Sequence, residues 1–246
     1  MKLPLLFSAM LLAAGSLPAT PMTFESGETP AALVELFTSE GCSSCPPADA
    51  WMSKLTRHPD LWKAIVPVVF HVDYWNGLGW PDRFATAAHT ARQRRYAAAW
   101  HSDSVYTPGF VLNGREWRSW SPREALPEPS SAKGGKLTVT VDDSKVDVAF
   151  VPTAETAKPL QVELAFLGGN LLSDVTRGEN SGHKLRHDFT VLRYRSAPLH
   201  VEIGRLTAAI SLPEKTSDAP VALAAWVTSG DAQPPLQATG GWLTGK

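Results

Sequence analysis

Apolar positions in the first half of the chain follow an alternation of short strands and helices. Residues 31–37 (AALVELF) and 65–72 (IVPVVFHV) are almost continuous apolar runs bounded by turn residues, which is typical of buried strands. Residues 46–57 carry apolar side chains at helical spacing behind two prolines, and the alanine-rich residues 83–100 also predict a helix. A third strand is expected at 109–112, before an Asn-Gly turn. This order predicts an α/β arrangement.

The second half of the chain has a different pattern. Residues 127–135 (PEPSSAKGG) have the composition of a linker. Beyond them, apolar segments separated by turn residues recur at 137–141, 146–151, 160–167, 189–194, 199–210 and 221–227. That pattern is typical of an all-β sandwich or barrel. We therefore predict an α/β domain at 31–128, followed by a mostly antiparallel, sandwich-like all-β domain at 136–246.

The first 19 residues have the pattern of a secretory signal peptide. One early cation, Lys2, precedes an apolar run at 5–14, and small and turn residues follow as far as Ala19. The run is shorter than the roughly 20 apolar residues that span a bilayer, so we expect cleavage after Ala19 and no stable membrane insertion afterwards. The alternatives are a buried first helix and a membrane anchor. The expected location is the periplasm or the exterior of the cell.

Composition and charge narrow the range of partners. The 246 residues are 43% hydrophobic and 19% charged, which is ordinary for a chain with a sizeable core. The formal net charge of -1 creates no global field toward nucleic acid, and we expect no nucleic-acid partner. The arginines of ARQRR (residues 91–95) are expected to form a solvated helix face. Two cysteines, Cys42 and Cys45, allow a single intramolecular disulfide.

The C-x-x-C pair is best explained as a redox centre. A bridge between Cys42 and Cys45 would close a very short loop, which adds little stability to a chain of this size. Between a buried strand and a helix, the motif is a redox arrangement in which the helix N-terminus stabilises a thiolate. We expect Cys42 to be the nucleophile and Cys45 the resolving thiol. Pro46 predicts that the helix begins only after Cys45, which weakens the activation of Cys42.

Longer motifs carry a family resemblance. Residues 31–128 resemble a thioredoxin-like domain, with CSSC after the first strand and Thr107-Pro108 before a later one. An uncharacterised "domain of unknown function" family of secreted bacterial thioredoxin-like proteins is similar in the stretches ELFTSEGCSSCPPAD, FHVDYWNGLGWPDRF, ARQRRYAAAW, VYTPGFVLNGR and RGENSGHKLRHDFTVLR. The resemblance implies a cis bond before Pro108, which packs beside the cysteine pair, and substrate-peptide contacts through the backbone of Thr107.

The resemblance also implies a buried acid near the cysteines. Glu35, in the first strand, matches the place of a proton acceptor for the second thiol, a role that a buried carboxyl with a raised pKa can fill. The alternatives for Glu35 are a solvent-facing strand residue and an ion pair. Glu40 is the competing acid; it is closer to the cysteines in sequence and is expected to be exposed.

Three residues at the end of the second strand are expected to shape the cleft beside the cysteines. These are His71, Asp73 and Trp75, with hydrogen bonds of His71 and Asp73 ordering the loop. The alternative is a soft Cu(I) or Zn(II) site made by Cys42, Cys45 and His71. Those three side chains still lack the fourth ligand that a closed zinc site requires.

The stretch RGENSGHKLRHDF offers further polar side chains. His183 and His187 lie four residues apart, a spacing that would suit a metal on a helix. We interpret this region as loop and strand, where a structural or hydrogen-bonding role is the better explanation. Arg177, Glu179 and Asn180 are expected to dock the second half of the chain onto the redox region.

Together these features predict an exported thiol–disulfide oxidoreductase acting on protein or small thiols. The redox group is the Cys42–Cys45 disulfide, and no other cofactor is expected. The expected partners are exported thiol or disulfide proteins and a redox protein that recycles the pair. Two alternatives stay open: a periplasmic metal protein, binding or delivering copper with Cys42, Cys45 and His71, and a binding module whose second half recognises a partner.

Overall fold

The structure is a computed structural model that describes residues 20–123, 125–126, 132–142, 145–156, 158–211, 220–230 and 232–243. The expected signal peptide, and residues 127–131 of the expected linker, lie outside these residues. The helices are α1 Pro46–Lys54, α2 Ala87–Ala99 and the 3₁₀ turns η1 Leu55–Arg57 and η2 Asn76–Leu78. The strands are β1 Met22–Glu25, β2 Ala32–Thr38, β3 Ile65–His71, β4 Gly109–Leu112, β5 Arg115–Glu116, β6 Lys136–Val141, β7 Lys145–Val151, β8 Gln161–Gly168, β9 Leu171–Asp174, β10 Lys184–His187, β11 Thr190–Pro198, β12 His200–Glu202, β13 Arg205–Ser211, β14 Ala222–Thr228 and β15 Gln237–Trp242.

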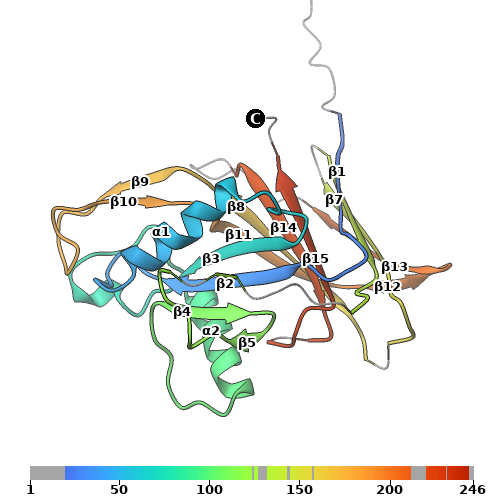
Figure 1. The fold of residues 1–246 in the computed structure, drawn as a ribbon, viewed down its shortest axis with the longest axis horizontal. Coiled ribbons are helices and arrows are strands. Elements are labelled where there is room, and N and C mark those ends of the chain that lie inside the picture. Colours follow the sequence, from blue (N-terminus) through green and yellow to red (C-terminus); the bar gives the residue numbers. More distant parts are fainter. Residues whose placement is uncertain are drawn as a thin grey trace, which may run out of the picture.

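An eight-stranded sheet forms the centre of the molecule (Figure 1). Its strand order is β15-β14-β8-β11-β3-β2-β4-β5. β3 pairs in parallel with both β2 and β11, and the other neighbouring strands pair antiparallel. A five-stranded sheet, β1-β6-β7-β13-β12, and the hairpin β9-β10 complete the β structure of the described residues.

The predicted fold class, a thioredoxin-like α/β domain followed by an all-β domain, is wrong. The described residues contain only two α-helices against fifteen strands, and the chain is mostly β. The largest sheet takes β2 to β5 from the first half and β8, β11, β14 and β15 from the second. The two halves join where Thr190 of β11 lies opposite Val69 of β3. Periodicity located the strands, but it carries no information on which strands pair.

The five-stranded sheet packs against one face of β8 and β14 in the central sheet. Buried side chains alternate along β6 and β7, as in strands with one face toward a core. They meet inward-facing residues of β8 and β14 in a second core, including Val162, Leu164 and Phe166. The intervening Ala165 and Leu167 belong to the first core, on the opposite face of β8. β8 is therefore buried on both faces, which explains its nearly continuous apolar sequence.

The two helices contact side chains that alternate along β2. Thr38 donates a hydrogen bond to Asp49 of α1. The neighbouring Phe37 packs edge-on against Tyr96 of α2 at a ring-centroid distance of 6.2 Å. Because successive side chains of a strand point to opposite faces, α1 and α2 cover opposite sides of β2, as Figure 1 shows. The sheet therefore separates side chains of β2 that face α1 from those that face α2.

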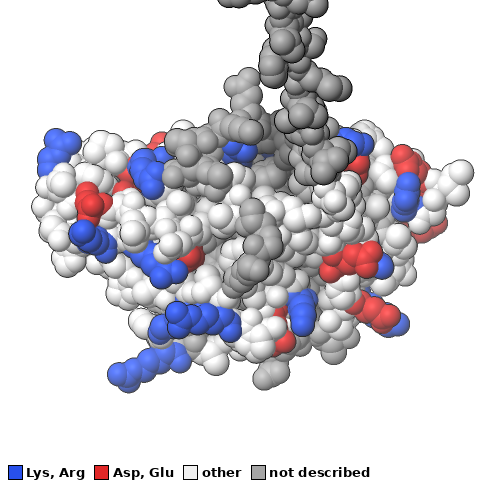
Figure 2. Space-filling model, turned by 90° about the horizontal axis from the view of Figure 1, so that it is seen from above, with Lys and Arg blue, Asp and Glu red and all other residues white. Residues whose placement is uncertain are grey.

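Basic and acidic side chains are interspersed over the exterior. In the view of Figure 2, Lys and Arg lie among Asp and Glu, and neither sign forms an extended patch on that face. This distribution agrees with the formal net charge of -1. The charges on this face therefore do not favour a strongly charged partner of either sign.

Arg92 of α2 is an exception to the expected solvated arginine face. Its side chain is only 3% exposed. The guanidinium contacts Glu35 of β2 at 2.7 Å and Glu163 of β8 at 3.2 Å, and it also donates to the hydroxyls of Tyr96 and Tyr194. Burial lowers the pKa of Arg92. The neighbouring carboxylates raise the pKa by more than burial lowers it, so the pKa lies above its ordinary value. One buried cation therefore links α2 to both halves of the central sheet.

We expect Arg92→Met to lower the free energy of unfolding by about 3–5 kcal/mol, because it leaves two buried carboxylates without their cation. Urea denaturation of the purified protein measures the change. The matched control is Arg94→Met, on the exposed side of the same helix, which should change stability by less than about 0.5 kcal/mol. Equal effects of the two substitutions would contradict a structural role for the Arg92 ion pairs.

Candidate functional site

The cysteine pair forms a disulfide at the start of α1. Cys42 and Cys45 are bonded and fully buried, whereas Ser43 and Ser44 between them are exposed. The helix begins at Pro46 with Cys45 as its N-cap, which confirms the late start predicted from the proline. Prolines at the first two helical positions have no N–H, and the Ala48 and Asp49 amides donate to the Cys45 carbonyl. The helix start therefore offers few free amides for a Cys42 thiolate.

A loop from the second half of the chain holds the cysteine loop in place. Asn180, between β9 and β10, donates from its side-chain amide to the carbonyls of Glu40 at 2.8 Å and Cys42 at 3.0 Å. The neighbouring Glu179 accepts a hydrogen bond from the Ser43 amide at 3.0 Å. The expected docking role is confirmed for Glu179 and Asn180. Arg177 is exposed.

Trp75 and Thr107 meet beside the cysteine loop. The indole N–H of Trp75 donates to the Thr107 hydroxyl at 2.8 Å. A Cβ placed on Gly41, directly before Cys42, would lie 3.0 Å from the Cβ of Trp75, so the tryptophan packs closely on this backbone. The bond between Thr107 and Pro108 is cis, and both residues are half-buried. Trp75 therefore contacts both the cysteine loop and the Thr107-Pro108 segment.

Glu35 and Asp73 have partners other than the cysteines. Both carboxylate oxygens of Glu35 are occupied, one by Arg92 at 2.8 Å and one by the hydroxyl of Tyr96 at 2.5 Å. Glu35 therefore forms an ion pair, which was one of the alternatives to the role of proton acceptor. It lies on the α2 side of the sheet. Asp73 accepts a hydrogen bond from Thr90 at 2.6 Å, which orders its loop against α2. The geometry gives neither residue a contact with the disulfide.

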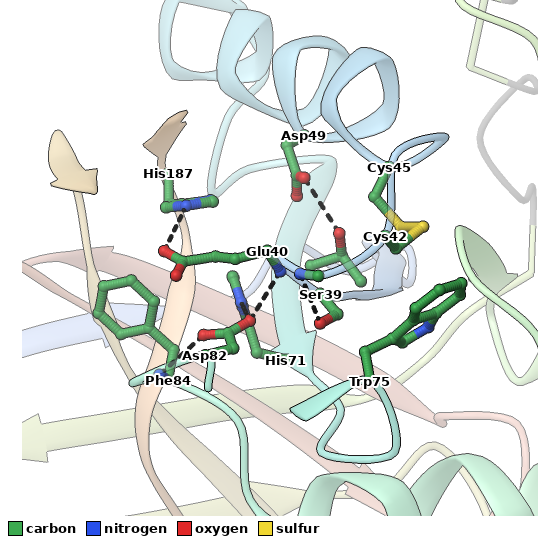
Figure 3. A network of polar contacts seen from close by, with 12 residues as sticks. Ser39, Glu40, Cys42, Cys45, Asp49, His71, Trp75, Asp82, Phe84 and His187 are labelled. Atoms are coloured by element: carbon green, nitrogen blue, oxygen red, sulfur yellow. Dashed lines mark hydrogen bonds and ion pairs between the residues drawn. A yellow bond between two sulfur atoms is a disulfide. The ribbon is translucent and has the colours of Figure 1, made fainter. Parts of the chain in front are cut away.

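A buried polar cluster lies under α1, next to the disulfide (Figure 3). His71, expected at the cleft, is fully buried, and its Nδ1 is 2.7 Å from Asp82. Nε2 of His187, in β10, lies 3.1 Å from a carboxylate oxygen of Glu40. Glu40 was expected to be exposed, but it is buried, with 1% of its surface exposed. The two imidazole rings lie 4.9 Å apart between centroids, nearly perpendicular. The cluster is completed by Asp49, whose carboxylate accepts from Thr38.

The sequence analysis named His71, Glu40 and His187 separately, but it missed Asp49 and Asp82 and did not bring the five residues together. Asp49 follows Cys45 by four residues, which places both on one side of the helix start, and that spacing was a usable signal. His187 was considered only together with His183, which is exposed. Asp82 lies in a loop with no distinguishing pattern. The contact between His187, at the end of β10, and Glu40, in the loop after β2, depends on tertiary packing. The spacing of residues along the sequence does not reveal such a contact.

Burial and pairing shift the titration of the cluster. Burial raises the pKa of the Asp49 carboxyl. Burial also opposes ionisation of Asp82, but His71 and two backbone amides outweigh it and lower the pKa of Asp82 to about 2. For His71, burial lowers the pKa and the Asp82 carboxylate raises it more, so the pKa ends above its ordinary value. The contact between His71 and Asp82 therefore favours the charged form of both groups.

Comparisons with known proteins identify a family and a fold. The chain belongs to a family of proteins of unknown function, DUF1223, whose model matches residues 33–228. A crystal structure of a protein from Agrobacterium tumefaciens is similar with a TM-score of 0.60 and 24% identity, covering 87% of this chain and 95% of that one. HBP35 of Porphyromonas gingivalis is similar with a TM-score of 0.54 and 14% identity, covering 88% and 76%. Identities this low concern the fold alone. No curated protein matches the sequence.

Acid should weaken the His71–Asp82 pair. The folded pKa of Asp82, about 2, lies below its ordinary value of 3.8, so its contribution is fully present above that value and is lost as pH falls toward 2. We expect Asp82→Asn to remove about 2 kcal/mol of stability above pH ~4, and the difference from the unmodified protein to shrink toward pH ~2. Urea denaturation across this pH range measures it. A difference that does not change with pH would contradict the pairing.

The Asn180 contact should be important for the cysteine loop. Asn180→Ala removes two hydrogen bonds to buried backbone carbonyls, and we expect a loss of about 1–3 kcal/mol together with faster amide hydrogen exchange at residues 40–45. The control is Ser181→Ala, whose exposed hydroxyl bonds Thr176 within its own loop. If both variants leave exchange at the cysteine loop unchanged, the loop is held by other contacts.

Proposed function

We propose that this member of the DUF1223 family is an exported thiol–disulfide oxidoreductase that works through the Cys42–Cys45 bond. The observation that carries the proposal is the placement of the pair: two buried cysteines flank two exposed serines at the start of α1, beside Trp75 and the half-buried Thr107-Pro108 segment. A bridge across so short a loop adds little stability, so its chemistry is the better reason for its presence.

The proposed reaction is a reversible dithiol–disulfide exchange. In one direction, a substrate thiolate attacks a sulfur of the Cys42–Cys45 bond, forms a mixed disulfide and displaces the other cysteine as a thiolate. A second substrate thiol then attacks the mixed disulfide, which yields an oxidised substrate and two protein thiols. In the other direction, Cys42 attacks a substrate disulfide, and Cys45 displaces the reduced substrate. A recycling redox protein returns the pair to its starting state.

The surroundings set two conditions on this exchange. Because both cysteines are fully buried, a substrate sulfur reaches them only after the residues that cover them move. The hydroxyl of Ser44 lies 3.3 Å from the Cys42 sulfur, and after reduction it can donate a hydrogen bond to the thiolate. That contact matters more here because Pro46 and Pro47 remove two helix amides.

An exported location supports the same function. The pattern of residues 1–19 is that of a signal peptide, and disulfides persist outside the reducing cytosol. Neither helix of the described residues has the length and apolar character needed to cross a membrane. The proposed partners are exported proteins with thiols or disulfides and the protein that recycles the pair.

Trapping of mixed disulfides tests the proposal. In the full chain expressed with its leader, Cys45→Ser removes the resolving thiol, and we expect adducts with exported proteins that a reductant releases, seen on non-reducing gels. Cys42→Ser is the matched variant and should trap far less, because it removes the nucleophile while keeping one thiol. The proposal fails if Cys45→Ser forms no adducts and the unmodified protein neither oxidises a model dithiol nor reduces a model disulfide.

A further inference from the structure

Two buried histidines in the polar cluster each have one nitrogen bonded and one without a partner. Nδ1 of His71 faces Asp82, and Nε2 of His187 faces Glu40. An ionised carboxylate only accepts hydrogen bonds, so the nitrogens that face these carboxylates carry the protons. The opposite atoms, Nε2 of His71 and Nδ1 of His187, are buried without a hydrogen-bond partner. Buried nitrogens without a partner require an explanation. Each can bind a metal ion through its lone pair when it carries no proton.

A buried carboxylate lies close to both imidazoles. One oxygen of Asp49 and one nitrogen each of His71 and His187 all lie within 4.8 Å of one another, and all three residues are buried. They come from three elements, α1, β3 and β10. Figure 3 shows Asp49 and the two imidazoles grouped below α1, to one side of the disulfide.

We propose that Asp49, His71 and His187 form a binding site for a divalent transition-metal ion such as zinc. Two imidazoles and a carboxylate are a ligand set that suits Zn²⁺ and related ions. Three protein ligands leave a fourth coordination position open.

The carboxylates behind the histidines support this assignment. Metal-binding histidines usually donate their second nitrogen to a carboxylate or carbonyl, which fixes the ring and raises its basicity. Asp82 and Glu40 stand in that place for His71 and His187. Asp82 is itself held by the backbone amides of Glu40 and Phe84, and Glu40 by the indole of Trp80. A hydrogen-bond network formed only to stabilise the core would not need to leave one nitrogen of each histidine unbonded.

The site also has a route from the exterior. A cavity of about 460 Å³ opens between α1 and β10, and its lining includes Asp49 and His187 together with Pro46 and Arg186. Ligand atoms of a tetrahedral zinc ion lie roughly 3.3 Å apart at bond lengths of about 2.0 Å, so the three side chains close inward on binding. A single bridging water is the competing occupant, since it also satisfies several polar atoms at once.

This site is distinct from the one that the cysteines would form. In the oxidised protein, both sulfurs are bonded to each other and supply no thiolate. Metal bound under oxidising conditions is therefore assigned to the histidines and Asp49. The measurement needs no disulfide exchange, so its failure and that of the proposed oxidoreductase function are separate results.

Titration of the oxidised full chain with Zn²⁺, by calorimetry or equilibrium dialysis, tests the site. We expect one bound equivalent, and Co²⁺ in its place should give a tetrahedral or five-coordinate visible spectrum without a thiolate charge-transfer band. Asp49→Asn keeps size and a hydrogen-bond acceptor for Thr38, and His187→Ala removes a ligand; both should weaken binding at least about tenfold. Circular dichroism verifies that each variant is folded.

Two controls separate this site from its competitors. His183→Ala changes an exposed histidine four residues from His187 and should leave the affinity unchanged. The double variant Cys42→Ser with Cys45→Ser should also keep its zinc. The proposal is overturned if the unmodified protein binds no stoichiometric Zn²⁺, which leaves the water as occupant. It is equally overturned if folded Asp49→Asn binds as tightly, or if binding depends on the cysteines or on His183.

Discussion

A buried guanidinium connects the two halves of this chain. Arg92 requires carboxylate partners because an uncompensated charge in the interior costs several kcal/mol, on the order of 3–5. Its partners, Glu35 and Glu163, belong to β2 and β8, which are separated by β3 and β11 in the sheet. The aromatic rings of Phe70, Tyr96, Tyr194 and Trp226 surround the cation at 5.2–5.4 Å. Both carboxylates contact the cation only when both halves are in place.

The central sheet separates the Arg92 ion pairs from the disulfide and the polar cluster. The α2 side contains the Arg92 ion pairs, which also occupy Glu35. The α1 side contains the disulfide and the cluster of Asp49, His71 and His187, as Figure 3 shows. An acid near the cysteines must therefore come from α1 or its neighbours, and Asp49 is the buried carboxyl that α1 supplies.

Local elements were predictable from the sequence, whereas their assembly was not. The strands near residues 31–37 and 65–72 follow from continuous apolar runs, and the helix start at Pro46 follows from proline stereochemistry. The sequence of a strand that is buried on both faces does not show which strands pair with its two edges. The pairing of Thr190 with Val69 therefore could not be predicted from the local sequence. Arg92 was predicted to be solvated together with the other arginines of ARQRR, and only the sheet beneath α2 distinguishes it from the exposed Arg94.

The same two elements support both chemical groups on the α1 side. α1 begins immediately after Cys45 and presents Asp49 one turn later. The β9–β10 hairpin holds the cysteine loop through Asn180 in its connecting loop, and it places His187 at the end of β10. Glu40 links the two groups directly, since its carbonyl accepts from Asn180 and its carboxylate from His187. The cysteine loop and the polar cluster therefore meet at a single residue, Glu40.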